Sequence, residues 1–210
     1  MGPMAKAEVH DQTIQDVSQT LLDLLTMNLS GDQIKIGLMS PKEDPGQNHL
    51  TLFLYKVLEN AYLKNAENQI AKTDDHGRLI QSRAPLTLDL YYLLTARSAA
   101  GGILAAHRAL SRAMRVFYDN GVLHGSLVHT LDPKHGLTSE SVLRITLNPL
   151  TMEDMTRIWS VFPDTPYEIS VAYLVTPVAI ESTLEDTSAP VVDQFHEHGQ
   201  RGAELAGART

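Results

Sequence analysis

Residues 84–118, APLTLDLYYLLTARSAAGGILAAHRALSRAMRVFY, contain the clearest structural pattern in the chain. Apolar residues occupy alternate positions from Leu86 to Leu94, and this two-residue period is typical of a β-strand. A glycine pair then precedes apolar residues at helical spacing, which predicts a helix from about residue 102 to residue 118. The expected inward stripe of that helix is Ile103, His107, Leu110, Met114 and Phe117. The stretch therefore predicts a strand followed by an amphipathic helix, and it contains no catalytic motif.

The same periodicities predict the other elements of the fold. A helix is expected over residues 11–29, and a shorter one after Thr151, a residue type that caps helix starts. Further strands are expected at residues 34–38, 50–58, 142–147 and 167–176. The resulting order, αβββαβαβ, predicts an α+β fold whose mainly antiparallel sheet packs with two or three helices.

Three details of this pattern can be tested against a structure. The strand at residues 50–58 has apolar residues on both faces, which predicts a central strand covered on both sides. Residues 59–70 are polar and are predicted to be irregular, with a turn at residues 74–77. Pro177 is expected to end the last strand or to place it at a sheet edge.

The chain divides into one folded domain and two less regular ends. Its 210 residues fit a single domain, which the periodic patterns place at residues 11–181. Residues 1–10 are expected to be disordered and residues 182–210 to form a flexible tail, because neither has a periodic apolar pattern. The tail contains one short hydrophobic patch, Val191, Val192 and Phe195.

Composition excludes several classes of function. The formal net charge of −8 argues against general nucleic-acid binding, because phosphate contacts need clustered lysines and arginines. The chain has no cysteine, so disulfides, thiol catalysis and thiolate metal sites are excluded. No apolar run approaches the roughly 18 residues that a membrane helix needs. We therefore expect a protein with neither membrane nor nucleic-acid partners.

No group of residues predicts catalysis or a cofactor. His124, His129 and His135 lie near one another in sequence, but no pair of histidines has the helical spacing of a zinc protease. Asp89 is an unusual charge within an apolar strand and could be a catalytic carboxylate. No nucleophile or second carboxylate stands near it, so an exposed position, or a pair with an arginine such as Arg112, is the better interpretation. We expect no enzyme activity, no metal and no cofactor.

A row of arginines is the strongest candidate for a binding surface. Arg108, Arg112 and Arg115 fall on one face of the predicted helix, and Arg97 precedes them. The row is either a solvated helix face or a docking surface for an acidic patch on a neighbouring subunit. The other candidate interface residues are Asp89, His135 in the loop predicted at residues 125–140, and Phe195 in the tail.

Four stretches of the chain, in the same order and at similar spacing, resemble a known family. They are LFLYKVLEN at residues 52–60, PLTLDLYYLLTA at 85–96, AHRALSRAM and VFYDN within 106–120, and RIWS and PYEISVAY within 157–173. The family is the N-terminal domain of tail-terminator, or cap, proteins of extracellular contractile injection systems, the antifeeding-prophage and Photorhabdus virulence cassette type. The resemblance covers residues 10–181, and its motifs are structural rather than chemical.

This resemblance implies a fold like that of phage tail terminators, and a structural role. Such a protein is expected to form a homohexameric ring on the distal end of the inner tube and sheath, where it ends polymerisation and stabilises the extended particle. The implied partners are further copies of the chain and the tube and sheath subunits. Assembly is expected in the cytoplasm, within a particle that can leave the cell. A ring of this kind needs heterologous subunit contacts that close, and it needs no active site.

Two other hypotheses stay open at the level of the sequence. A baseplate or sheath-adaptor subunit of the same machine would share these structural motifs. A hydrolase or metal-dependent enzyme built on Asp89 or on the histidines is the least favoured, because the chain has no nucleophile motif and no cysteine.

Overall fold

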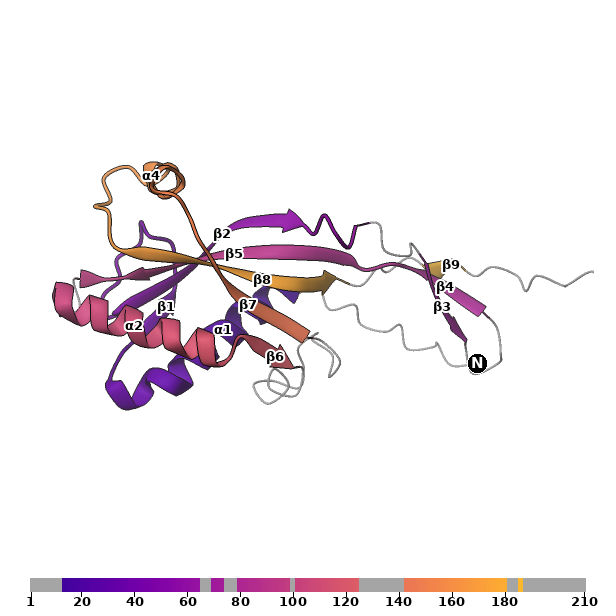
Figure 1. Ribbon diagram of the computed structural model, residues 1–210, viewed down its shortest axis with the longest axis horizontal. Coiled ribbons are helices and arrows are strands. Elements are labelled where there is room, and N and C mark those ends of the chain that lie inside the picture. The colour runs from indigo at the N-terminus through magenta and orange to yellow at the C-terminus, as the bar shows by residue number, and fades with distance from the viewer. Residues whose placement is uncertain are drawn as a thin grey trace, which may run out of the picture.

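A six-stranded sheet forms the body of the molecule, and helices cover its two faces (Figure 1). The computed structural model describes residues 13–64, 69–73, 79–98, 101–124, 142–180 and 185–186. The strands of this sheet, in the order β1-β2-β5-β8-β7-β6, are β1 (Ile36–Leu38), β2 (Leu50–Glu59), β5 (Leu86–Ala96), β8 (Ser170–Ile180), β7 (Val142–Asn148) and β6 (Val122–His124). Strands β1 and β2 pair in parallel, and the other pairs are antiparallel. The predicted α+β fold with a mainly antiparallel sheet is therefore confirmed.

Helices α1 (Thr13–Leu29) and α2 (Ile103–Asp119) cover one face of the sheet and enclose the main core. A short 3₁₀ helix, η1 (Ser30–Asp32), follows α1. The residues that β5 contributes to this core are Leu88, Leu90, Tyr92, Leu94 and Ala96. Side chains alternate across a strand, so the alternation in the sequence of β5 predicted this inward face from Leu88 onward. Leu86, the first residue of the alternation, is 46% exposed.

Helix α4 (Met152–Ser160) covers the opposite face, where Met155 and Trp159 pack on Leu93 of β5. Thr151 caps this helix: its hydroxyl accepts a hydrogen bond from the N–H of Asp154 at 3.1 Å, and the Asp154 carboxylate accepts one from the N–H of Thr151 at 3.3 Å. The predicted helix start is confirmed. Among the described residues, no helix is both long enough and apolar enough to cross a membrane.

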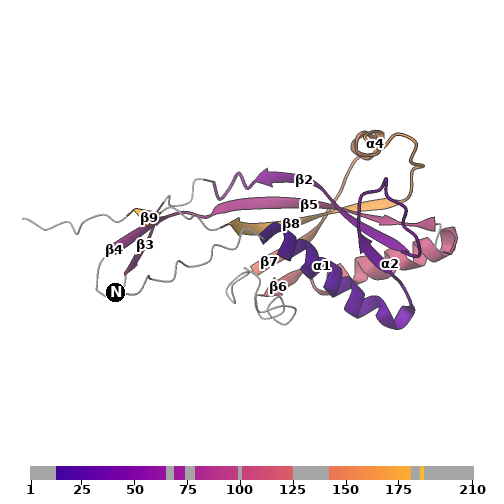
Figure 2. The same ribbon diagram turned by 180° about the vertical axis from the view of Figure 1, so that it is seen from behind.

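Three further strands form an arm that projects from one end of the body (Figure 1 and Figure 2). They are β3 (Gln69–Thr73), β4 (Leu79–Arg83) and β9 (Glu185–Asp186), paired antiparallel in the order β3-β4-β9. In the chain β3 follows β2, β4 precedes β5, and β9 follows β8. The arm therefore repeats the order β2-β5-β8 of the central strands beyond the helical cover of the body.

Residues 59–70 were predicted to be irregular, and the structure corrects this at the two ends, because Glu59 still belongs to β2 and β3 begins at Gln69. Residues 60–64 belong to no strand, as predicted. Strands beyond the body need not carry the alternating apolar pattern that burial imposes, so their sequence gives no clear period. The turn predicted at residues 74–77 lies outside the described residues, as do residues 1–10. Of the predicted tail, only β9 is described.

Strand β8 corrects the expectation for Pro177. The strand continues through Pro177 to Ile180, and it lies in the centre of the sheet rather than at an edge. The register shifts where Thr176 and Pro177 together oppose Asp89 of β5, which is a β-bulge. Strand β7 pairs with β8 only as far as Thr176, so a proline without an N–H is tolerated just beyond that pair.

The inward face of α2 also differs from the predicted stripe. Leu110 and Phe117 are buried as expected, but Ile103 and His107 are exposed. The remaining buried residues of α2 are Ala106, Ala109, Ala113 and Val116. Alanines let the helix approach the sheet closely, and a pattern based on large apolar residues misses this face.

Candidate assembly surfaces

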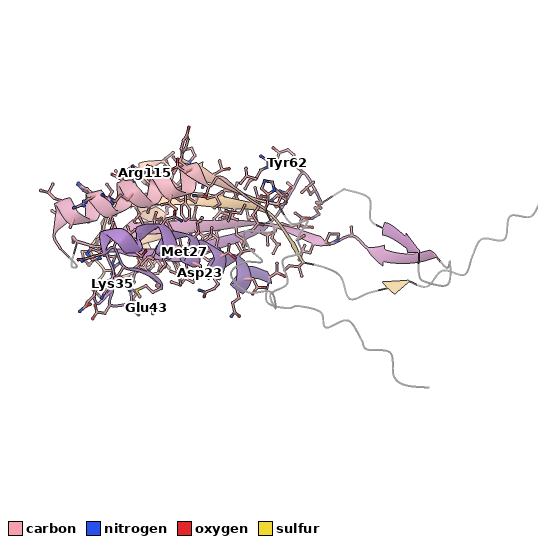
Figure 3. All side chains as sticks on the ribbon, turned by 90° about the horizontal axis from the view of Figure 1, so that it is seen from below. Asp23, Met27, Lys35, Glu43, Tyr62 and Arg115 are labelled. Carbon is pink, nitrogen blue, oxygen red and sulfur yellow. The ribbon has the colours of Figure 1, made fainter. Side chains whose placement is uncertain are left out.

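The outward side of α2 presents a row of basic and apolar side chains. Leu104, Arg108, Ser111, Arg115 and Tyr118 recur every three or four residues, so they share one face of the helix, which we call the basic face. Leu104 and Tyr118, at its two ends, are 84% and 86% exposed. Figure 3 shows Arg115 on the outer side of α2. Exposed arginine and aromatic side chains of this kind are enriched in surfaces that bind other proteins.

The charge of the basic face is not neutralised within the described residues. Helix α2 contains no acidic residue before Asp119, and neither Arg108 nor Arg115 forms an ion pair with a described residue. Arg112 lies half-buried beside the basic face and has contacts of its own. Arg108 and Arg115 are two helical turns apart, about 10.5 Å along the axis. In a chain of net charge −8, they present positive potential to an acidic partner.

Arg97, predicted to precede this row, lies inside the body. It is 6% exposed, and its Nε is 3.0 Å from Oε2 of Glu168, in an ion pair rather than a hydrogen bond. Its terminal nitrogens donate hydrogen bonds to the carbonyls of Pro41 at 3.2 Å and Glu43 at 3.3 Å. Ser98 donates to Oε1 of Glu168 through its N–H at 2.8 Å and its hydroxyl at 2.9 Å. These contacts join the loop before β2 to the end of β5 and the start of β8, so the Arg97 side chain is not available to a partner.

Asp89 organises the turn that follows β2, which we call the root of the arm. It is half-buried at the bulge of β8, where its Oδ1 accepts hydrogen bonds from Nδ2 of Asn60 at 2.8 Å and from the hydroxyl of Thr176 at 2.5 Å. The side-chain oxygen of Asn60 accepts hydrogen bonds from the N–H groups of Tyr62 and Leu63, each at 3.0 Å. The network therefore fixes the turn through which the chain leaves β2, and Figure 3 shows Tyr62 at the end of the body from which the arm projects.

The structure replaces both sequence-based interpretations of Asp89. The carboxylate is neither fully exposed nor paired with Arg112, because its partners are the neutral side chains of Asn60 and Thr176. The turn at Asn60 could have been predicted from the sequence, since asparagine after a strand favours a local turn of this type. No sequence pattern indicates that Glu168 is the partner of Arg97, because the two residues are distant in sequence and adjacent only in space.

The remaining candidate residues are distributed as follows. His135 and Phe195 lie outside the described residues, as do His129, His196 and His198. His124 is exposed at the end of β6. In the part of the chain that the structure describes, no three His, Asp or Glu side chains are grouped closely enough to hold a metal ion.

The fold is similar to that of terminator proteins from contractile injection systems. One is the sheath/tube terminator of the extracellular contractile injection system PVC in its extended state, with a TM-score of 0.63, 22% sequence identity, and coverage of 93% of this chain and 66% of that chain. Another is the tube-terminating cap of the anti-feeding prophage, with a TM-score of 0.57, 16% identity, and coverage of 93% and 61%. The chain thus spans less than two thirds of the length of either protein.

The sequence identifies the family. Residues 16–194 match the model of the Pvc16 N-terminal domain, and the chain belongs to this family. The family resemblance predicted from the four stretches is confirmed. The match includes β9 and continues to residue 194, beyond the domain end expected at residue 181. No curated protein matches the sequence.

Proposed function

We propose that this chain forms a cap ring on the distal end of the inner tube and sheath of a contractile injection system. The ring ends polymerisation and stabilises the extended particle. The observation that carries this proposal is the similarity of the fold, over 93% of the chain, to both a sheath/tube terminator and a tube-terminating cap. Membership of the Pvc16 N-terminal domain family supports the same role.

A terminating ring of six identical copies requires two different surfaces on each copy that fit one another around a closed circle. The basic face on α2 is proposed as one of them. The chain contains 25 acidic and 17 basic residues, so the surface of a neighbouring copy is on balance complementary to it. Complementary charge of this kind fixes the register of a contact and speeds encounter more than it adds affinity.

The other predicted interface residues are proposed to have supporting roles. Arg112 flanks the basic face. Arg97 and Asp89 act indirectly, by holding the loop before β2 and the root of the arm in place. His135, in the segment between β6 and β7, and Phe195, after β9, are proposed to reach a neighbouring subunit.

The proposed role consists of binding and requires no chemical step. The partners are further copies of the chain and the tube and sheath subunits, with no nucleic acid, no membrane and no cofactor. We propose no enzyme activity. The ring is assembled in the cytoplasm and can leave the cell within the particle.

Native mass spectrometry of the purified chain, alone and with tube and sheath subunits, tests this proposal. A six-copy ring is expected, formed either alone or only with those partners, and electron microscopy should find it at the tube end away from the baseplate. A persistent monomer that ignores both partners would overturn the proposal. A ring found at the baseplate end would favour a baseplate or adaptor subunit instead.

A charge reversal tests whether the basic face contributes to ring assembly without contributing to the stability of the fold. The double variant Arg108→Glu/Arg115→Glu should weaken ring assembly by about tenfold or more at low salt, because like charges then meet across the contact. Its urea unfolding midpoint should stay unchanged, since both side chains are exposed. Arg144→Glu changes an exposed arginine on β7 and is the matched control. Equal assembly of the double variant and the control would exclude the basic face as an interface.

A further inference from the structure

One edge of the main sheet is unpaired over most of a strand. Strand β1 pairs with β2 only from Leu50 to Leu52, and beyond β1 the N–H of Met39 makes one more hydrogen bond on this side, to the Leu52 carbonyl at 3.1 Å. From Phe53 to Glu59, β5 is the only described strand beside β2. We call residues 53–59 the open edge. Every second residue of such an edge presents an N–H and a C=O without a strand partner.

The open edge also carries exposed apolar surface. Val57 is 41% exposed and Leu58 is 43% exposed. The ammonium group of Lys56 lies 4.6 Å from the centroid of the Tyr91 ring on β5, so this lysine lies over the face of the sheet and leaves the edge accessible. The protection against pairing within the described residues is a bulge after Leu54 and the charge of Glu59 at the end of the edge, which forms an ion pair with Lys64 at 2.8 Å. Edges with this composition attract another strand unless they are covered.

The arm continues the open edge and determines where the chain leaves. In the order β3-β4-β9, β3 occupies the outer position that β2 holds in the order β2-β5-β8. Strand β9 lies on the other side of β4, so the chain leaves the arm from the side opposite the open edge. Each copy therefore has an accepting edge on one side and a departing C-terminal segment on the other. A head-to-tail ring requires this arrangement.

We propose that residues 187–195 of one copy add as a strand to the open edge of the next copy, an inference that rests on the ring proposed above. The family match extends to residue 194, so nearly all of this segment belongs to the family domain. Its sequence, TSAPVVDQF, favours an extended chain, because Pro190 disfavours a helix before it and Val191 and Val192 are β-branched. Asp193 supplies a charge opposite to that of Lys56 on the edge.

The length of the segment fits the edge. Nine extended residues span about 30 Å at roughly 3.3 Å per residue, and the seven-residue open edge spans about 23 Å. The segment can therefore pair along the whole edge. Main-chain hydrogen bonds supply the affinity in contacts of this type, and side chains on alternate positions supply the specificity. In a closed ring, every open edge receives one segment, and no open edge is left to recruit a further subunit.

Cysteine cross-linking tests this contact directly, because the chain has no cysteine of its own. Val57→Cys and Val192→Cys are introduced together into the full chain, which is assembled with tube and sheath subunits and then oxidised. A ladder of covalent oligomers that ends at the size of the ring is expected on non-reducing gels. A mixture of the two single-cysteine variants should give dimers only, since each copy then carries one thiol.

The pair Met27→Cys and Val192→Cys is the matched control, because Met27 is more exposed than Val57 but lies on α1, outside both the open edge and the basic face. An equally strong ladder from the control pair, or cross-links confined within single copies, would overturn the strand addition. Rings that bind the tube end without any cross-link would also overturn it, while the cap function would stand. A ladder formed by copies that bind neither tube nor sheath would instead refute the cap function, and the absence of both rings and cross-links would refute both proposals.

Discussion

Replacing Arg97 by methionine should lower the free energy of unfolding by about 3 kcal/mol. Arg97 and Glu168 are 6% and 15% exposed and lie 3.0 Å apart. Removing one partner of a buried ion pair typically costs about 3–5 kcal/mol, because the other charge is left behind without a partner. Ser98 donates two hydrogen bonds to Glu168 and offsets part of that penalty, so we expect a loss near the low end. In a domain of this size, the loss lowers Tm by roughly 6–12 °C.

The single tryptophan of the chain, Trp159, reports on this region. Its ring centroid lies 5.4 Å from that of Tyr167, the residue before Glu168. Urea unfolding followed by tryptophan fluorescence and by circular dichroism therefore measures the loss. The ion pair between Arg157 and Glu153 on α4 is the matched control, because both side chains are 73% exposed. Arg157→Met should cost no more than about 0.5 kcal/mol.

A second substitution separates two causes of the loss, which are the Glu168 carboxylate left without its partner and the lost packing of the Arg97 side chain. Adding Glu168→Gln to Arg97→Met neutralises the unpaired carboxylate and should restore part of the stability, so the two losses should not add. If Arg97→Met is as mild as Arg157→Met, the buried pair does not contribute to stability as argued. If the double variant loses the sum of the two single losses, the two residues are not coupled.

Three further predictions concern the arm root, a helix start and alkaline pH. Asn60→Ala removes the hydrogen bond to Asp89 and the two hydrogen bonds from backbone N–H groups of the turn. Urea unfolding should therefore show a free energy of unfolding lower by about 2 kcal/mol. An unchanged value would mean that the network does not stabilise the root of the arm. Thr151→Ala removes the cap of α4 and should lower the free energy of unfolding by about 1 kcal/mol in the same assay. Thr156→Ala on the same helix should lower it clearly less. Equal losses would contradict the capping argument. Burial raises the pKa of Tyr92 from 10.0 to about 12, so the folded state keeps a proton that the unfolded state releases. This contribution is complete below pH 10 and is lost, by up to about 3 kcal/mol, as the pH rises from 10 to 12. Tyr92→Phe should show a shallower decline in unfolding free energy over that range, and equal slopes would count against this argument.

The body of the fold could be predicted because burial imposes a period on the sequence. The alternation along β5 predicted the strand, and from Leu88 onward it predicted the inward face as well. The side chain of Thr151 marked the start of α4. The helix at α2 was predicted with its inward face rotated, because alanines contribute little to an apolar pattern although three of them are buried in that face. Local signals of this kind depend only on neighbouring residues in the chain.

The candidate surfaces were only partly predictable. Helical spacing predicts that Arg108 and Arg115 share a face, and the structure places both on the basic face. The same reasoning fails for Arg97, because the burial of that residue depends on Glu168 and on carbonyls of a distant loop. Contacts between segments that are far apart in sequence leave no periodic signal. For that reason the role of a charged residue cannot be inferred from its neighbours alone.

Strand β2 shows how a sequence pattern can describe an assembly rather than a single copy. Its apolar residues on both faces predict a strand covered on both sides. The body meets that expectation at the start of β2, where the neighbours Thr51 and Leu52 point to opposite faces and are both buried. Beyond them Val57 and Leu58 are exposed, and the outer side of the strand has no described partner. Within one copy this second half is a mismatch between sequence and burial. A strand added by the next copy would pair the edge and shield part of this apolar surface, so the cross-link at Val57 also tests whether the sequence of β2 is adapted to the ring.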